Sequence, residues 1–300
     1  MAEFRTSDGV VLNIQDTGGG VTVLLVHGWT SDSRVWSPLV NALAGEVRLL
    51  RYDQRGHGRS ERGPATLPRL ADDLAEVIAK STTGPIVLVG HSMGGMVMMA
   101  LAECHPDLVT DRIAAAMFVA TSSGRMDEAT FGLPKPLVRA YFNRSGRGSG
   151  HSRPSAPSRI QAFAGLVFLR WLAFGHRFRL VDLRSAGDQL ARAHRGTTGA
   201  LRREITGNHA RGPALAVYAK IPTEVLVGDR DRVIPPTHAA EIARLLPGTE
   251  FVRYPGAGHM LPYERTAELA RRVLRLASGV RRGGGGPGLG PLPPAAGAHG

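Results

Sequence analysis

One serine stands between glycines at the point where an apolar run of the chain ends. Residues 86–95 read IVLVGHSMGG, so Ser92 follows four aliphatic residues and lies in a Gly-x-Ser-x-Gly pattern. A serine hydroxyl is a weak nucleophile at neutral pH, and it needs an imidazole to accept its proton and a carboxylate to orient that imidazole. The pattern therefore raises the hypothesis of nucleophilic catalysis, with a histidine and an acid supplied from elsewhere in the chain.

The surroundings of the serine strengthen this hypothesis, because Gly-x-Ser-x-Gly alone occurs by chance in many loops. Residues 86–89 predict a buried strand, and residues 93–104 predict a helix. Between a strand and a helix, the serine occupies a strained turn, and the glycines let the two elements pack closely. The helix would begin at Met93, so we expect its backbone N–H to point toward an oxyanion formed at the serine.

Short β-rich runs alternate with helical patterns, which is typical of an α/β domain with a mostly parallel sheet. Runs that are apolar at successive positions, such as VLLV and IVLV, suit strands covered on both faces. Strands are predicted at 4–5 and 10–15 as an opening hairpin, then at 21–26, 47–52, 86–89, 113–120, 223–228 and 250–255. Helices are predicted at about 35–44, 68–81, 93–104, 237–246 and 263–277.

A second strand end carries a candidate oxyanion donor. The strand over 21–26 runs into His27, Gly28 and Trp29, where the glycine permits a turn. The backbone N–H of Trp29, which follows this glycine, could therefore join that of Met93 in binding an oxyanion.

Five motifs together resemble, in order and spacing, those of the α/β-hydrolase superfamily: HGW (27–29), DQRGHGRS (53–60), GHSMGG (90–95), GDRDRVIP (228–235) and GAGH (256–259). The likeness covers about residues 3–121 and 221–277. It implies an α/β-hydrolase fold, with a mostly parallel central sheet flanked by helices, in a member similar to serine esterases and lipases with a cap insertion.

The resemblance also implies the chain order serine, acid, histidine. His259 fits the last position, since it follows a predicted strand and a Gly-Ala-Gly turn. The family places the acid three residues after a glycine, with a proline behind it. This selects Asp231, with Pro235 behind it, over the alternative Asp229.

Other polar residues in the motifs are given structural roles. His91 neighbours the nucleophile and is expected to point away from it, and His27 is expected to hydrogen-bond locally and shape the oxyanion turn. His57 lies inside the second motif and is not selected as the base. Asp53 is expected to make structural hydrogen bonds, and Arg55 suits a tight loop beside the site.

The residue at the nucleophile position decides among reactions of the superfamily. Relatives that open epoxides or displace halide use an aspartate there, whereas this chain has Ser92. We expect acyl transfer to water through Ser92, His259 and Asp231, with the oxyanion bound by the N–H groups of Trp29 and Met93. This chemistry requires no metal or organic cofactor.

Three alternatives stay open at this point. Cofactor-free haloperoxidase or perhydrolase activity would use the same triad, as would hydrolysis of carbon–carbon bonds in diketones. The alternative from another class is a non-catalytic hydrolase-fold protein that binds a ligand or partner.

The alternation of strands and helices stops between residues 122 and 220. This predicts a helical cap over 122–220, inserted into a core of residues 1–121 and 221–278. Within 158–175 one helical face is apolar, and it must be covered by the core, an acyl chain or a membrane surface. Since the cap commonly sets specificity in the superfamily, we expect an ester substrate with an apolar acyl or aromatic group. The apolar positions are Ile160, Phe163, Val167, Trp171 and Phe174.

The net charge of +12 arises in this same segment. Residues 122–220 hold 17 Lys and Arg against 5 Asp and Glu, and the remainder holds 20 of each. The basic residues could form a solvated face, attract an anionic substrate or make transient contact with anionic lipid headgroups. Nucleic acid is not expected, because no recognisable binding motif accompanies the charge.

The remaining sequence features concern location and order. The N-terminal residues show no secretory signal and no stretch suits a membrane span, so a cytoplasmic location is expected. Cys104, the single cysteine, is expected to be a small core residue. Residues 279–300 are rich in Gly and Pro and are predicted to be disordered.

Overall fold

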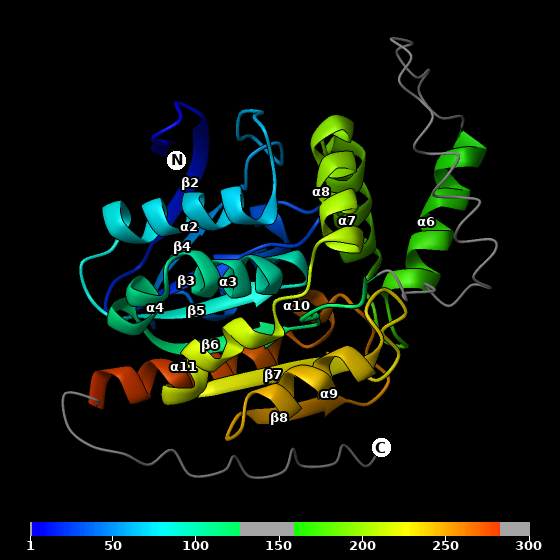
Figure 1. The fold of residues 1–300 in the computed structure, drawn as a ribbon. Helices are drawn as coiled ribbons and strands as arrows, with labels where there is room; N and C mark the ends of the chain where they lie inside the picture. The colour runs from blue at the N-terminus through cyan, green and yellow to red at the C-terminus, as the bar shows by residue number, and fades with distance from the viewer. Residues whose placement is uncertain (1, 127–158, 283–300) are drawn as a thin grey trace.

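A sheet of eight strands forms the centre of the molecule in the computed structural model, which describes residues 2–126 and 159–282 (Figure 1). The strand order is β1-β2-β4-β3-β5-β6-β7-β8. The opening hairpin is antiparallel, as is the β2–β4 pair, and every other pair is parallel. The strands are β1 (Ala2–Arg5), β2 (Val11–Thr17), β3 (Thr22–Val26), β4 (Arg48–Tyr52), β5 (Ile86–His91), β6 (Ile113–Val119), β7 (Thr223–Gly228) and β8 (Glu250–Tyr254).

The central strands are buried on both faces, as their continuous apolar runs predict. Every residue of β3 and β5 is buried. Successive side chains point to opposite faces, so Leu24 and Leu88 join one core cluster while Val23 and Val87 join the other. Helices α2 (Leu67–Ser81), α3 (Met93–Cys104) and α9 (Pro236–Leu245) cover the first face, and α1 (Ser37–Ala42) and α11 (Thr266–Arg282) cover the second.

The predicted helices are present, with changes at their ends. The helix predicted at 35–44 is divided into the 3-10 helix η1 (Ser33–Trp36) and α1. The segment begins at Ser33 because the Asp32 side chain caps its N-terminus by accepting from the Arg34 N–H at 3.0 Å. The helix predicted at 263–277 is divided into α10 (Leu261–Glu264) and α11. The short helix α4 (Pro106–Arg112) was not predicted, since seven residues give too little periodicity.

The insertion is helical over its described part. It contains α6 (Arg159–Ala173), α7 (Leu180–Arg192), α8 (Arg195–Gly207) and the 3-10 helix η3 (Gly212–Lys220). The phenolic O–H of Tyr218 in η3 donates to the Met98 carbonyl in α3 at 2.8 Å. Residues 212–220 therefore pack on the core, although the sequence assigns them to the cap. The Gly/Ser/Pro-rich passage 144–158 lies outside the described residues.

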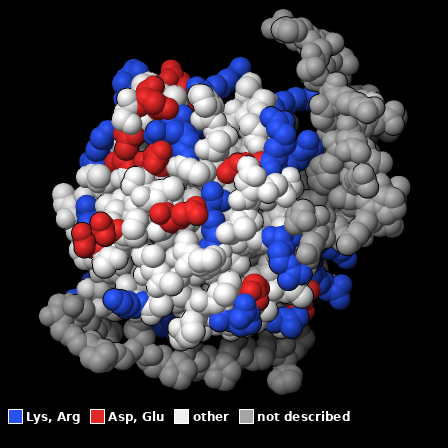
Figure 2. Space-filling view, viewed as in Figure 1, with Lys and Arg blue, Asp and Glu red and all other residues white. Residues whose placement is uncertain are grey.

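The apolar face of α6 is only partly covered. Phe174, just after the helix, is buried and its ring lies 6.3 Å from that of Tyr263, whereas Phe163 and Val167 are 70% and 53% exposed. Of the three covers that the sequence leaves open, packing on the core is found only at the C-terminal end of this segment. Figure 2 shows Lys and Arg side chains grouped over α8, while the surface over α2 carries both signs of charge.

Two expectations at helix ends need correction. The prediction for Cys104 is wrong, because its side chain is exposed at the last turn of α3, where the helix leaves the core. Partial desolvation, then Glu103 and Asp72, raise the pKa of its thiol and disfavour the reactive thiolate. Helix α11 runs to Arg282, so residues 279–282 are helical, and the rest of the predicted tail lies outside the described residues. Over the described ranges, no helix combines the length and apolarity needed to cross a membrane.

Candidate active site

Ser92 lies between β5 and α3 in a conformation that side chains rarely adopt. Its φ and ψ angles are 54° and −122°. The surroundings hold this strained backbone on both sides, because the Ser92 N–H donates to the Val119 carbonyl at 2.9 Å and the Ser92 carbonyl accepts from the Thr121 hydroxyl at 2.7 Å. The strained turn predicted from the sequence is therefore present.

A glycine after the serine allows the close packing that this turn needs. A Cβ atom at Gly94 would lie 2.2 Å from the Val26 carbonyl oxygen of β3. Any larger residue would push α3 away from the end of the neighbouring strand. The start of α3 at Met93 is thereby fixed directly after Ser92, as expected for a helix N-terminus facing an oxyanion.

His259 and Asp231 form a buried pair. The His259 Nδ1–H donates to Asp231 Oδ2 at 2.8 Å, and the side chains are only 7% and 0% exposed. The other carboxylate oxygen of Asp231 accepts from the N–H groups of Val233 and Ile234 at 2.9 and 2.8 Å. The acid is thus fixed in place, and with Nδ1 donating, the Nε2 atom of a neutral His259 is free to accept a proton.

The alternative acid does not contact this histidine. Asp229 lies on the exposed side of the same loop, where its carboxylate accepts from the Gly256 N–H at 2.8 Å. The structure therefore pairs His259 with Asp231, the acid that the family pattern selects.

His91 links the serine turn to the histidine loop. Its Nε2–H donates to the His259 carbonyl at 3.0 Å, and the two rings lie 4.9 Å apart. Burial, and then the nearby His259, lower the pKa of His91 to about 3, so its ring stays neutral. Sequence reasoning missed this anchoring role, for which the only signal is the position of His91 beside Ser92.

The turn after β3 also lies against the serine. A Cβ atom at Gly28 would lie 3.0 Å from that of Ser92. The His27 Nδ1–H donates to the Gly28 carbonyl at 2.8 Å, and Nε2 accepts from the Gln54 N–H at 2.9 Å, so the expected role of His27 in shaping this turn is confirmed. The indole N–H of Trp29 donates to the Thr198 carbonyl at 2.9 Å, which ties the turn to α8. Oxyanion binding by the Trp29 and Met93 N–H groups remains a prediction.

The loop over 53–60 is held by structural contacts, as expected. Asp53 accepts from the Ser33 and Arg59 N–H groups at 2.7 and 2.9 Å. Burial, and then His27, lower the pKa of His57 to about 3, so this ring stays neutral.

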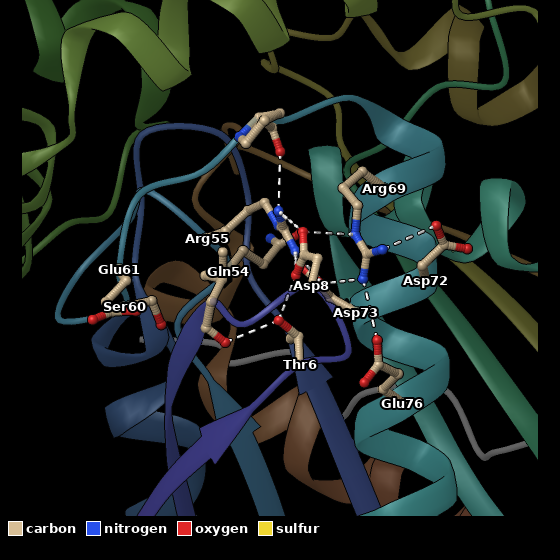
Figure 3. A network of polar contacts seen from close by, with 12 residues as sticks. Thr6, Asp8, Gln54, Arg55, Ser60, Glu61, Arg69, Asp72, Asp73 and Glu76 are labelled. Atoms are coloured by element: carbon tan, nitrogen blue, oxygen red, sulfur yellow. Dashed lines mark hydrogen bonds and ion pairs between the residues drawn. The ribbon is translucent and has the colours of Figure 1, made fainter.

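Arg55 anchors this loop to α2. Its guanidinium is fully buried and donates from Nε and Nη2 to the two carboxylate oxygens of Asp73, both at 2.6 Å. It also contacts Asp8 at 2.9 Å. Figure 3 shows Arg55 and Arg69 converging on these two carboxylates at the N-terminal end of α2. Within the described ranges, no three His, Cys, Asp or Glu side chains cluster so as to hold a metal ion.

Comparison with known proteins identifies the fold family. Residues 21–266 match the family model described as alpha/beta hydrolase fold. The chain is 29% identical over 265 residues to 2-(acetamidomethylene)succinate hydrolase of Mesorhizobium japonicum, which covers 83% of this chain and 85% of that one.

Solved structures agree with this family model. A thermophilic esterase from Thermogutta terrifontis is 27% identical and superposes with a TM-score of 0.73, covering 94% of this chain and 99% of its own. A bromoperoxidase from Bacillus anthracis is 20% identical with a TM-score of 0.76, covering 92% and 99%, and shows the fold alone. The family model spans most of the chain, and we conclude that this protein belongs to the α/β-hydrolase fold family.

Proposed function

We propose that the protein is a serine hydrolase that cleaves carboxylic esters with an apolar acyl or aromatic group. The observation that carries this proposal is the buried His259–Asp231 pair, whose loop is bonded to the residue before the strained Ser92. The likeness to a hydrolase and to an esterase, each over more than four-fifths of the chain, supports it.

The reaction follows from the roles of these groups. Ser92 Oγ attacks the ester carbonyl while His259 Nε2 takes the serine proton, and Asp231 holds the imidazole through Nδ1. The N–H groups of Trp29 and Met93 bind the oxyanion. The imidazolium then protonates the leaving alcohol, and water, activated by the same imidazole, releases the acid from the acyl-enzyme.

The insertion supports an apolar substrate. Helix α6 presents Phe163, Val167 and Phe168 as exposed apolar side chains, and its C-terminal end contacts the histidine loop. Transient contact of the basic cap residues with anionic lipid, and a cytoplasmic location, remain predictions.

The test is hydrolysis of p-nitrophenyl esters of increasing chain length by the wild type, Ser92→Ala and the control Ser7→Ala, whose serine lies on the surface. We expect Ser92→Ala to lose at least about 10³-fold in kcat, and Ser7→Ala to match the wild type. A fluorophosphonate probe should label the wild type at Ser92 alone. Background rates and no labelling in the wild type would instead favour a non-catalytic binding protein.

The same assays separate the reactions that share the triad. Peracid formation from hydrogen peroxide with acetate, or cleavage of a diketone, at a rate above every ester would replace ester hydrolysis as the main activity. The likeness to a bromoperoxidase gives no preference between them, since it rests on the fold.

A further inference from the structure

Glu264, at the end of α10, joins two backbone segments that are far apart in the sequence. Its Oε2 atom accepts from the Gly175 N–H at 2.7 Å, just after α6. Its Oε1 atom accepts from the Gly258 N–H at 3.0 Å, directly before His259. One carboxylate therefore binds both the end of the cap helix and the loop that carries the histidine.

The two segments also contact each other directly. The N–H groups of His259 and Met260 donate to the Ala173 carbonyl at 2.8 and 3.1 Å, and the His176 N–H donates to the Gly256 carbonyl at 2.7 Å. A Cβ atom at Gly258 would lie 2.6 Å from the Gly175 nitrogen. The histidine loop is thus fixed against the end of α6, with Glu264 bonded to both.

We propose that Glu264 is a positioning residue for His259, and that its ionised carboxylate keeps the imidazole aligned with Ser92 by binding the histidine loop to the end of the cap helix. The inference rests on the proposed function, because alignment matters only if His259 transfers protons. A small displacement of a catalytic group lowers the rate by about 10- to 100-fold.

The protonation state of Glu264 changes near neutral pH. Burial raises the pKa of this carboxyl to about 7, against the opposing effects of the Gly175 and Gly258 N–H groups and Arg265. Glu264 is one of the residues that line a cavity of about 670 Å³. The other charged or titratable groups on the surrounding elements include Arg34, His176, Arg177, Arg179, Asp182, Asp231, His259, Tyr263 and Glu268.

Glu264→Gln tests the role of the charge at nearly constant shape. Oε1 contacts the Gly258 N–H and Oε2 contacts both N–H groups, at 2.7 Å for Gly175 and 3.1 Å for Gly258. In either orientation of the amide, its NH₂ group therefore faces the Gly258 N–H, and two donors cannot bond. The contact next to His259 is weakened however the glutamine is placed.

The first measurement is kcat for a p-nitrophenyl ester from pH 6 to 8. At pH 8 we expect Glu264→Gln to be about 10- to 100-fold slower than the wild type, and at pH 6, where wild-type Glu264 is mostly protonated, the ratio should fall toward one. The matched control is Glu268→Gln, four residues along on the same cavity, with an expected ratio near one throughout. A ratio for Glu264→Gln that is near one, or that does not change with pH, overturns the proposal.

The second measurement does not require activity. Amide hydrogen exchange at pH 8 should show at least about tenfold lower protection at Gly258 in Glu264→Gln. The amides of Val233 and Ile234, which bond to Asp231, should be unchanged and serve as an internal reference. Unchanged protection at Gly258 would overturn the proposal even if the wild type proved inactive on every ester, an outcome that would separately contradict the proposed function.

Discussion

Two regions of the molecule hold carboxylates in different ways. Beside the loop over 53–60, Asp73 and Asp8 meet the guanidinium of Arg55, which is itself buried. At the end of α10, Glu264 meets mainly backbone N–H groups. The side-chain bond to Arg55 holds the pKa of Asp8 well below its usual range, whereas burial raises that of Glu264 to about 7.

The carboxylates bonded to Arg55 stabilise the fold, whereas the carboxyl of Glu264 can affect catalysis. The bond to Arg55 keeps the Asp8 carboxylate ionised well below neutral pH, so this contact does not change within the working pH range. A carboxyl that titrates near neutrality beside His259 changes its bonding within the working pH range, and such perturbed groups gather at functional sites. The following substitutions test this contrast.

Asp231→Asn should give the largest effect, and only on activity. The asparagine oxygen can still accept from Val233 and Ile234, but its NH₂ would face His259 Nδ1 and favour the tautomer with the proton on Nε2, which cannot accept the serine proton. We expect kcat for p-nitrophenyl acetate to fall by about 10³- to 10⁴-fold, with little change in urea unfolding. Retention of more than about a tenth of the activity would show that Asp231 is not the acid of the triad.

Asp73→Asn should show the reverse pattern. It leaves the fully buried Arg55 with Asp8 as its remaining charged partner, and removing one member of a buried pair costs about 3 kcal/mol or more of unfolding free energy. Urea unfolding measures the loss, while kcat of the folded enzyme should stay near the wild-type value. Asp16→Asn, at the partly exposed pair with Arg48, is the control and should cost less than about 1 kcal/mol. Equal losses in both variants would show that the buried Arg55–Asp73 pair contributes no more to stability than a partly exposed pair.

Much of the site could be predicted because its signals are local. The turn at Ser92 is predicted from residues 86–95 alone, where an aliphatic strand is followed by Gly90 and Ser92 and then by the start of a helix. The order of the later motifs points to Asp231 and His259. The strands were predicted well for a similar reason, since a strand buried on both faces shows as a continuous apolar run.

Two kinds of contact could not be predicted from the sequence. They are the contacts made by backbone groups and those that depend on packing between elements far apart in the chain. The partners of Glu264 are N–H groups, which every residue except proline carries and which leave no trace in the sequence. The period of α6 shows an apolar face but not what covers it, and the structure leaves Phe163 exposed. Cys104 follows an apolar helix whose last turn leaves the core, and periodicity does not mark that point.

The smallest of these predicted effects is that of Glu264→Gln on how the free energy of unfolding depends on pH. The pKa of Glu264 is raised from its ordinary value of 4.5 to about 7 by burial, so the folded state binds its proton more tightly than the unfolded state does. This contribution to stability is fully present below pH 4.5 and is lost as the pH rises through 7. A glutamine at this position is neutral at every pH, so the variant does not lose this stability as the pH rises.

Relative to the wild type, Glu264→Gln should therefore gain about 1–3 kcal/mol of unfolding free energy between pH 5 and pH 8, measured by urea unfolding at each pH. Groups shared by both proteins cancel in this difference, and Glu268→Gln should show no such trend. Because the same substitution is expected to slow the enzyme at pH 8, stability and activity would move in opposite directions at one residue. A difference that stays constant with pH would show that Glu264 is not held with a raised pKa, and the contrast with the arginine-paired Asp8 would then be lost.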